Sequence, residues 1–337
     1  MQAIEIKKPV RLCVDGRLND RSVGWAKHPL VQCNVTGSYP RKKKWNYWCV
    51  TSPEVLFSAT ISHIDYAAVM FVYILDLTTK EFYEKTSLIP FGKGVHMPEG
   101  VRESLHYDGK DMRIHFDELD ESTMLTISIY DFGGGKGLNA DIKLSRPDKY
   151  ESLNVVVPWT QKRFQFTSKQ PAIPASGKIT WGDKIYSMQS DRAFGCLDFG
   201  RGVWKYASNW NWGSASGVID GQRIGLNFGG QWTDKTGQNE NGFVINDRLH
   251  KIHDDINWDY DNNDYHKPWR LTTIGSDRVN LQFMPIFERI AETKAVIIKS
   301  SVHQLIGHYQ GTIKTDDGKT IKIDSLLGWA EDHKAKW

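Results

Sequence analysis

The sequence predicts an all-β protein that folds as two tandem domains, each a β-barrel or a β-sandwich, with few short helices. The chain has 337 residues, which exceeds the usual size of one hydrophobic core and favours two domains. Apolar and polar residues alternate in many short segments, as they do in half-buried strands. Asp-Gly pairs, which are strong hairpin signals, separate several of these segments. We expect one domain over residues 1–165 and a second over residues 166–337.

Period-two alternation predicts strands in the N-terminal half. In residues 112–116 and 125–130 every second residue is apolar, which places the apolar side chains on one face of each strand. Residues 67–75 are apolar at nearly every position, as expected of a strand buried on both faces. The pair Asp108-Gly109 precedes the first of these segments and predicts a turn there.

Hairpins are also predicted in the C-terminal half. Asp220-Gly221 lies between the alternating residues 212–219 and 223–228. Asp317-Gly318 likewise separates residues 308–314 from residues 319–323. Each pair predicts a tight turn between two antiparallel strands.

Two departures from regular strand patterning are predicted. Pro158, Pro171 and Pro174 lie in a segment with little alternation, and proline disfavours continuous pairing within a sheet. We therefore place the connection between the two domains around residues 158–176. Helical patterns are scarce, and only residues 287–294 and the last dozen residues are predicted to be helical.

The composition excludes several classes of protein. Lysine and arginine total 43, aspartate and glutamate total 40, and both signs are dispersed along the chain, which argues against a nucleic-acid-binding surface. The start lacks the apolar core of a signal peptide, and no segment reaches the roughly 18 apolar residues of a membrane span. Four cysteines are widely and irregularly spaced, as expected of reduced thiols. We expect a cytoplasmic protein without a transmembrane segment.

No cofactor and no metal are predicted. Residues 133–137 resemble a phosphate loop but lack its leading glycine and the Ser or Thr after the lysine. His250 and His253 stand beside aspartates, and these residue types are zinc ligands. In a strand, however, the two histidines would face opposite ways, and no third ligand is fixed. The usual dehydrogenase, hydrolase and metalloprotease motifs are absent.

Residues 198–213 have the densest aromatic pattern in a chain with 13 Trp, 13 Tyr and 14 Phe. Trp204 and Tyr206 are predicted to share one strand face, as are Trp210 and Trp212, with a bend or bulge between the two pairs. These aromatic side chains would line a ligand pocket, since Trp and Tyr combine an apolar face with a hydrogen-bonding group. A heavily packed core between sheets is the alternative.

Polar residues near the aromatic pairs are the candidates for chemistry. Arg201 lies between two glycines, which predicts a cation held at a turn, and with Asp198 it would anchor a ligand. Glu240 follows a glycine-rich loop, where burial among aromatic residues would raise its pKa and suit it to acid or base work. Glu240 and Asp198 are therefore the predicted catalytic residues, although a carboxylate that only accepts hydrogen bonds at a strand start is the alternative. Further predicted ligand-binding residues are the polar side chains Asn227, Gln231 and Asn241.

Several separated motifs resemble the bacterial family catalogued as domain of unknown function 2804. The motifs that carry the resemblance are Gly200-Arg201-Gly202-x-Trp204-x-Tyr206 with Trp210 and Trp212, Asn227-Phe228-Gly229, Glu240-Asn241, Pro268-Trp269-Arg270, Gly328-x-Ala330-Glu331-x-His333-x-x-x-Trp337, and the early Asp15-Gly16, Gly24-Trp25 and Trp45-x-x-Trp48. Together they cover nearly the whole chain. Trp269 and Glu331 lie in these motifs and complete the set of predicted ligand-binding residues.

The resemblance implies an architecture and a range of reactions. That family is similar to the lipocalin-like enzymes tocopherol cyclase, carotenoid hydratase and the fungal Diels-Alderases. It therefore implies two lipocalin-like (calycin) barrels side by side, with a pocket in or between them. In such a pocket aromatic faces stabilise positive charge and a buried carboxylic acid protonates an alkene.

Three ligand-binding functions remain open from the sequence, beside a structural or protein-binding role that would require an exposed aromatic patch instead of a cavity. The first is a cofactor-independent cyclase, hydratase or isomerase with Glu240 as its acid or base. The second is a non-catalytic carrier or sensor for a small apolar or sugar-bearing ligand, which the scattered asparagines would suit. The third is a glycoside-processing enzyme, in which Glu240 with Glu331 or Asp198 would supply two carboxylates about 5 Å apart.

Overall fold

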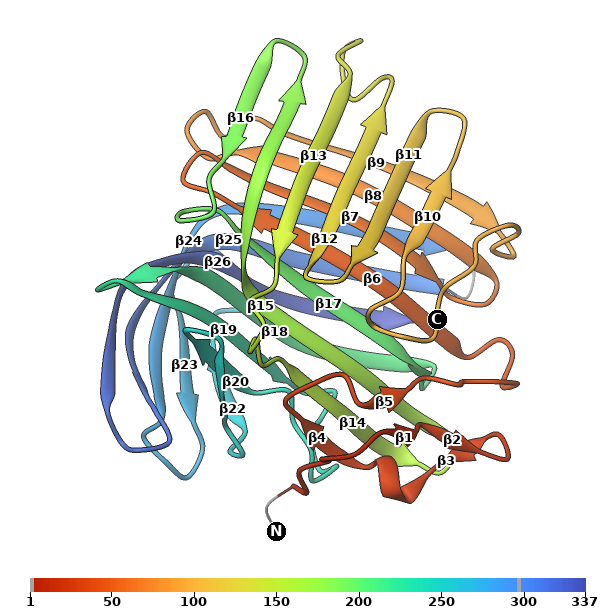
Figure 1. Cartoon of the computed structure of the whole chain (residues 1–337), viewed down its shortest axis with the longest axis vertical. Helices are drawn as coiled ribbons and strands as arrows, with labels where there is room; N and C mark the ends of the chain where they lie inside the picture. Colours follow the sequence, from red (N-terminus) through yellow and green to blue (C-terminus); the bar gives the residue numbers. More distant parts are fainter. Residues whose placement is uncertain (1–2, 296–297) are drawn as a thin grey trace.

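The computed structural model describes residues 3–295 and 298–337, which form two large antiparallel sheets (Figure 1). Each sheet curls on itself, so that the chain forms two lipocalin-like domains. In the described part of the chain the one helix is a 3-10 turn over Asp20–Ser22. None of these residues forms a helix of the length and apolar character that a membrane span requires. The all-β prediction is confirmed.

The first sheet has thirteen strands and occupies the upper part of Figure 1, with β4 and β14 extending below it. Its main path is β10-β11-β12-β13-β15-β17-β6-β7-β8-β9, while β14 and β16 also pair with β15, and β4 pairs with β14. The strands are β4 (Gly24–Ala26), β6 (Lys42–Thr51), β7 (Val55–His63), β8 (Ala67–Asp76), β9 (Phe82–Pro90), β10 (Leu105–Asp108), β11 (Met112–Leu119), β12 (Ser122–Ile129), β13 (Leu138–Ser145), β14 (Leu153–Thr160), β15 (Arg163–Trp181), β16 (Lys184–Met188) and β17 (Phe194–Val203).

The second sheet has nine strands in the order β21-β20-β19-β18-β26-β25-β24-β23-β22. Its strands are β18 (Ala207–Ile219), β19 (Gln222–Gly230), β20 (Gly242–Ile245), β21 (Arg248–Lys251), β22 (Ile256–Asp259), β23 (Trp269–Thr273), β24 (Val279–Ala295), β25 (Ile298–Lys314) and β26 (Thr320–Lys336). Two small pairs near the N-terminus, visible at the lower right of Figure 1, are β1 (Val10–Arg11) with β5 (Val31–Gln32) and β2 (Cys13–Val14) with β3 (Arg17–Leu18).

The predicted hairpins are present, and their turn residues explain them. At Asp220-Gly221 the chain returns from β18 to β19 with Ile219 opposite Gln222, and both turn residues have positive φ, 49° and 72°. That combination is typical of the two-residue turn whose twist matches a hairpin. Residues 112–116 of β11 pair with residues 125–129 of β12. Residues 67–75 form β8, which is buried on both faces along most of its length.

Both predicted helices are wrong. Residues 287–294 belong to β24, and the last dozen residues belong almost entirely to β26. Each of these strands is 17 residues long, and β25 pairs with both of them along nearly its whole length. Continuous pairing with a neighbour outweighs local helix propensity, which is a weak preference.

The prolines mark irregularities within strands and not a linker. Residues 163–181 form β15, the longest strand of the first sheet. The pairing of β15 with β17 shifts register between Gln170 and Ile173, where Pro171 and Ala172 lie, and Ala172 has φ 58°. Proline is tolerated at such bulges because no ladder hydrogen bond is lost there. The change from one sheet to the other falls between Val203 and Ala207, whereas we predicted the domain boundary at residues 165 and 166.

Three apolar clusters follow from the alternation of side chains along the strands. One cluster fills the first curled sheet and includes Trp48 and Phe199. A second fills the other sheet and includes Phe283 and Trp269. The third lies between the two sheets and contains residues of β6, β7, β8 and β17 from the first sheet and of β18, β25 and β26 from the second. We call this layer between the sheets the seam.

Candidate functional site

Alternate residues of the seam strands face either a domain interior or the seam. In β17, Leu197 and Phe199 belong to the interior cluster, whereas Cys196 belongs to the seam cluster. The same alternation in β6 directs Trp48 inward and Tyr47 into the seam. A strand between two apolar layers is expected to be apolar on both faces. The seam faces, however, also carry buried polar and charged side chains, and these form the candidate site.

One lysine and two carboxylates form a buried ion cluster in the seam. Lys169 of β15 lies directly opposite Asp198 of β17 in the strand register. The Nζ atom of Lys169 lies 2.9 Å from Oδ2 of Asp198 and 3.1 Å from Oε2 of Glu240, which precedes β20 of the other sheet. All three side chains are buried. A buried charge is tolerated when it is paired in this way.

The second sheet supplies most of the walls of this ion cluster. The Lys169 ammonium lies 4.4 Å from the ring centroid of Trp212, a cation–π contact. The Nε1 atom of Trp232 donates a 2.7 Å hydrogen bond to Oε1 of Glu240. A Cβ atom on Gly229 would lie 2.1 Å from that same carboxylate oxygen, so glycine is needed for Glu240 to pack against β19. The cluster is therefore closed by packing on several sides.

Lys251 holds the chain on either side of Glu240. Its ammonium donates to the side-chain oxygen of Asn239 and, over 3.1 Å, to the backbone oxygen of Asn241. Lys251 is buried, and burial lowers its pKa to about 7. Asn227 adds a further tie, because its side chain accepts from Nε1 of Trp212 and donates to the backbone oxygen of Glu240. These contacts position the Glu240 carboxyl.

The surroundings of the ion cluster favour a proton on the Glu240 carboxyl while Lys169 stays charged. Burial raises the pKa of Glu240; Lys169 opposes this effect, and the nearby negative charge of Asp198 adds to it. Burial alone would lower the pKa of Lys169, but the two carboxylates outweigh that effect and raise it. Lys169 is therefore charged, and the raised pKa of Glu240 favours a proton on its carboxyl.

The free energy of unfolding of the wild-type protein is expected to fall relative to that of Glu240→Gln as the pH rises. Because the folded state holds the Glu240 proton more tightly, it binds more protons than the unfolded chain above the ordinary glutamate pKa of about 4.3. The stability that this proton contributes is present at low pH and is lost as the pH rises. Urea unfolding of both proteins between about pH 4 and pH 8 measures the difference. Two parallel curves would contradict the raised pKa.

A second polar group lies beside the ion cluster in the seam, since Tyr47 of β6 is directly opposite Asp198 of β17. The hydroxyl groups of Tyr47 and Tyr73 are 2.8 Å apart, and the Tyr73 hydroxyl donates to Oε1 of Gln304 over 2.8 Å. Burial raises the pKa of both tyrosines, so both stay protonated. Arg289 of the second sheet makes two 2.8 Å hydrogen bonds to Glu84 of the first. The Tyr47 ring contacts Trp212 at 5.5 Å between centroids, which connects this group to the ion cluster.

Arg201 does not lie beside Asp198, and it does not lie in a turn as we predicted. Both residues are in the regular strand β17, and an odd spacing of three places them on opposite faces. Arg201 points into the first domain and is 0% exposed. Its guanidinium donates to the backbone oxygens of Pro98, Trp45 and Gly200 and to the side chain of Asn46. These contacts are those of a structural residue.

Trp204 and Tyr206 do not share a strand face, because residues 204–206 connect β17 to β18. Trp204 is buried and packs against five other tryptophans, and its Nε1 donates to Gln165 over 2.7 Å. Tyr206 is 42% exposed and contacts the Arg41 guanidinium. The partners of Trp204 are Trp45, Trp159, Trp210, Trp232 and Trp337. Much of the predicted aromatic wall is thus a tryptophan cluster packed upon itself.

Trp210 and Trp212 do lie two residues apart in one strand, β18. The Nε1 atom of Trp210 donates to Oε1 of Glu331 over 3.0 Å, and that oxygen also lies 3.3 Å from Nδ1 of His333. Glu331 therefore pairs with Trp210 and His333. Of the carboxylates that we predicted could pair with Glu240, only Asp198 contacts the same ammonium group, that of Lys169.

The remaining predicted ligand-binding residues make local contacts. Gln231 is exposed and donates to the side chain of Asn211 over 2.6 Å. Asn241 accepts from the backbone N–H of Gly229 and donates to the backbone oxygen of Asp254. These side chains hold the ends of the loop over residues 231–241, which carries Trp232 and Glu240.

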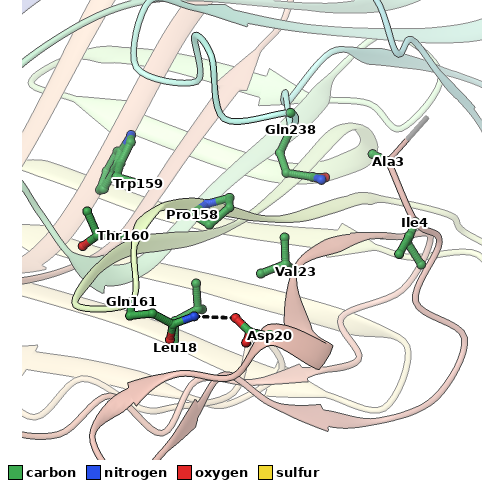
Figure 2. Close-up of a pocket in the computed structure, with 11 residues that line it drawn as sticks. Ala3, Ile4, Leu18, Asp20, Val23, Pro158, Trp159, Thr160, Gln161 and Gln238 are labelled. Atoms are coloured by element: carbon green, nitrogen blue, oxygen red, sulfur yellow. Dashed lines mark hydrogen bonds between the residues drawn. The ribbon is translucent and has the colours of Figure 1, made fainter. Parts of the chain in front are cut away.

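A pocket of about 720 Å³ opens beside this loop (Figure 2). Its wall is formed by the N-terminal segment, by the turn between β14 and β15, and by the loop at Gly237 and Gln238. None of the predicted site residues lines it. Trp159 does, and its Nε1 donates to the backbone oxygen of Trp232 over 2.8 Å. Glu240, the acceptor of Trp232, thus lies one aromatic side chain behind the pocket wall. The lining residues are Ala3, Ile4, Leu18, Asp20, Val23, Pro158, Trp159, Thr160, Gln161, Gly237 and Gln238.

The sequence analysis missed several polar residues of the seam, among them Lys169, Tyr47, Tyr73 and Gln304. Lys169 and Gln304 lie on long strands and are nearly fully buried. In the sequence, a single buried polar residue in a long strand is flanked by the same alternation of residues as a polar residue that faces solvent. Burial of this kind depends on the opposing sheet, which no short-range signal indicates.

Comparison with known proteins supports the fold. A sequence model of the family described as "Domain of unknown function (DUF2804)" matches residues 3–337, and no curated protein matches the sequence. The structure is similar to kievitone hydratase from Nectria haematococca, with a TM-score of 0.51 and 11% identity over 90% of this chain and 94% of that chain. It is also similar to CghA with Sch210972, with a TM-score of 0.49 and 11% identity over 88% of this chain and 89% of that chain. At 11% identity the first similarity shows a shared fold.

Proposed function

The chain belongs to the family described as "Domain of unknown function (DUF2804)", and that description gives no function. From the residues of this chain we propose that it is a cofactor-independent enzyme of the hydratase, cyclase or isomerase class. Glu240 is the proposed proton donor and acceptor, and Lys169 and Asp198 are the proposed positioning residues. The proposed substrate is a small ligand, apolar or sugar-bearing, that enters through the pocket beside Trp159.

The observation that supports this proposal is the state of the Glu240 carboxyl. Its side chain is 2% exposed and has a raised pKa. A buried carboxylic acid of this kind keeps its proton to a higher pH and is suited to protonate a carbon–carbon double bond or a carbonyl group. The nearby rings of Trp212 and Trp232 would stabilise positive charge that develops on the substrate.

Access to Glu240 requires a movement of the 231–241 loop. Gly237 and Gln238 line the pocket while Trp232, on the same loop, covers the carboxyl. Gln231, Lys235 and Gly237 have positive φ, and residues 231–238 make several short contacts within the loop. Trp232 also packs on Trp204, and its backbone oxygen accepts from Trp159, so these two contacts must change when Trp232 moves. A ligand that displaces the Trp232 ring would therefore gain contact with the Glu240 carboxyl.

Glu240→Gln is expected to reduce turnover by about a hundredfold or more, which is the usual contribution of a positioned general acid. The substrate is identified first, by native mass spectrometry of protein purified from its own host. Its conversion is then followed with wild-type protein and with Glu240→Gln.

Glu331→Gln is the matched control, because Glu331 is a buried carboxylate that contacts Trp210 and His333 instead of Lys169. This variant is expected to keep most of the activity. Full turnover by Glu240→Gln would refute the proposed role of Glu240.

A non-catalytic carrier is the second candidate, and one observation favours it. Both carboxylates already bind Lys169, and the 720 Å³ pocket does not reach them. A carrier would release its ligand unchanged, and Glu240→Gln would leave the affinity for that ligand unaltered. Val23→Trp, which fills the pocket from its lining, would abolish binding in either case.

The glycoside-processing alternative receives less support. Asp198 and Glu240 each have an oxygen within 3.1 Å of the same nitrogen atom, so these two oxygens are no more than about 6 Å apart, near the spacing of a retaining glycosidase. The space between them is, however, occupied by the Lys169 ammonium. The two carboxylates therefore do not flank an open site for a glycosidic bond.

A further inference from the structure

The outer face of the hairpin β10–β11 carries two histidines and two aspartates. His106 and His115 lie directly opposite each other on the antiparallel strands. Their rings are stacked, with centroids 4.4 Å apart and planes at 30°. The Nε2 atom of His106 lies 2.6 Å from Oδ1 of Asp117, and Nε2 of His115 lies 2.9 Å from Oδ1 of Asp108. The residues between them along each strand are buried, so all four side chains project from one face.

We propose that His106, His115 and Asp117 form a zinc-binding site. One ligand atom from each of these residues lies within 4.8 Å of the other two. Zinc binds imidazole nitrogen and carboxylate oxygen at about 2.0–2.2 Å in tetrahedral geometry, which separates neighbouring ligand atoms by about 3–4 Å. Rotation of the three side chains would bring their ligand atoms from within 4.8 Å to that spacing. A water molecule would complete the coordination.

The chemistry of the site favours zinc over calcium or magnesium. Two of the three ligand atoms are imidazole nitrogens, whereas calcium and magnesium prefer oxygen ligands. Asp108 also lies 2.9 Å from Nε of Arg113, so that carboxylate is already paired with a cation. Asp117 is the carboxylate with an oxygen within 4.8 Å of a ring nitrogen of each histidine. Its negative charge offsets part of the charge of the ion.

The position of the site suggests what the ion would do. β10 is the edge strand of the first sheet and pairs only with β11 on the main path. An ion bound by His106 of β10 and by two residues of β11 would cross-link the edge strand to its neighbour. We predicted no metal site from the sequence, where only His250 and His253 were considered as ligands. The hairpin turn separates His106 from His115 along the chain, and only the strand register brings them together.

Zinc titration of the full-length, chelator-treated protein tests the proposal. One zinc ion per chain is expected to bind, and the melting temperature is expected to rise with zinc concentration. Cobalt substitution should give the absorption bands of a tetrahedral nitrogen and oxygen site. His106→Ala, His115→Ala and Asp117→Asn should each weaken zinc binding at least tenfold and remove the thermal shift.

His266→Ala is the matched control, since His266 is an exposed histidine that contacts a carboxylate, Glu288, outside the proposed site. It should leave the zinc affinity unchanged. No measurable zinc binding, or binding that survives both histidine substitutions at the hairpin, would overturn the proposal. The variants lie on an exposed face, and circular dichroism of the metal-free proteins checks that each one is folded.

Discussion

Lys169→Met is expected to lower the free energy of unfolding by about 3–5 kcal/mol, the usual cost of removing one partner from a buried ion pair. The substitution keeps much of the side-chain volume but leaves Asp198 and Glu240 in the seam without their shared cation. Both carboxylates are nearly fully buried, and an unpaired buried charge is strongly unfavourable. Urea unfolding at neutral pH, followed by far-ultraviolet circular dichroism, measures the change.

A combined variant separates lost charge pairing from lost packing. Lys169→Met with Asp198→Asn and Glu240→Gln removes all three charges, and it should be more stable than Lys169→Met alone. Lys267→Met is the surface control, because Lys267 pairs with Asp261 in solvent, and no measurable change in the unfolding midpoint is expected. If Lys169→Met proves as stable as the wild type, the ion cluster is not closed to water, and the argument for the raised Glu240 pKa fails.

Trp269→Ala is expected to lower the free energy of unfolding by about 3–5 kcal/mol, as large-to-small substitutions of buried aromatic residues do. Trp269 is 0% exposed and belongs to the core of the second domain. Its ring stacks on Tyr260 at 3.9 Å between centroids, and its Nε1 donates to the backbone oxygen of Tyr265 over 3.0 Å. The substitution removes these contacts and leaves a cavity. Chemical unfolding measures the loss.

The same variant distinguishes two roles for Trp269. We predicted it as a ligand-binding residue, whereas its surroundings are those of a core residue. If Trp269 is a core residue, Trp269→Ala should lose much of its stability. The fraction that stays folded should then bind the ligand with unchanged affinity. Tyr130→Ala is the control, since Tyr130 is 86% exposed and its removal should change stability by no more than about 0.5 kcal/mol. A stable Trp269→Ala protein without ligand affinity would restore the binding role.

The polar seam connects these results to function. Arg289 joins the second sheet to Glu84 of the first, and Gln304 joins it to Tyr73. The two sheets are therefore held together by hydrogen bonds as well as by apolar contact. Such networks favour one relative placement of the two domains, because a shifted placement would leave several buried groups unpaired. A fixed placement keeps Lys169 of one domain against Glu240 of the other.

Local pattern determined the strand content of this protein. The alternation in residues 112–116 and the Asp220-Gly221 pair act over a few residues, and the strands and turns formed where they predicted. The aromatic residues of 198–213 were identified as an unusual concentration, and Glu240 as the carboxyl among them. These predictions depended on side-chain alternation and turn chemistry, which are properties of neighbouring residues. The resemblance of separated motifs to one family added the two-domain lipocalin-like architecture.

Tertiary structure decided which residues meet. The strand spacing sends Arg201 to the interior of the first domain and Asp198 to the seam, although we had paired them. The helices predicted at residues 287–294 and at the C-terminus became strands because β25 lies beside both segments. Lys169 joined Glu240, and His106 joined His115, through pairing and packing of distant segments. Charge burial and ligand geometry depend on such long-range contacts, so only the folded chain could bring these side chains together.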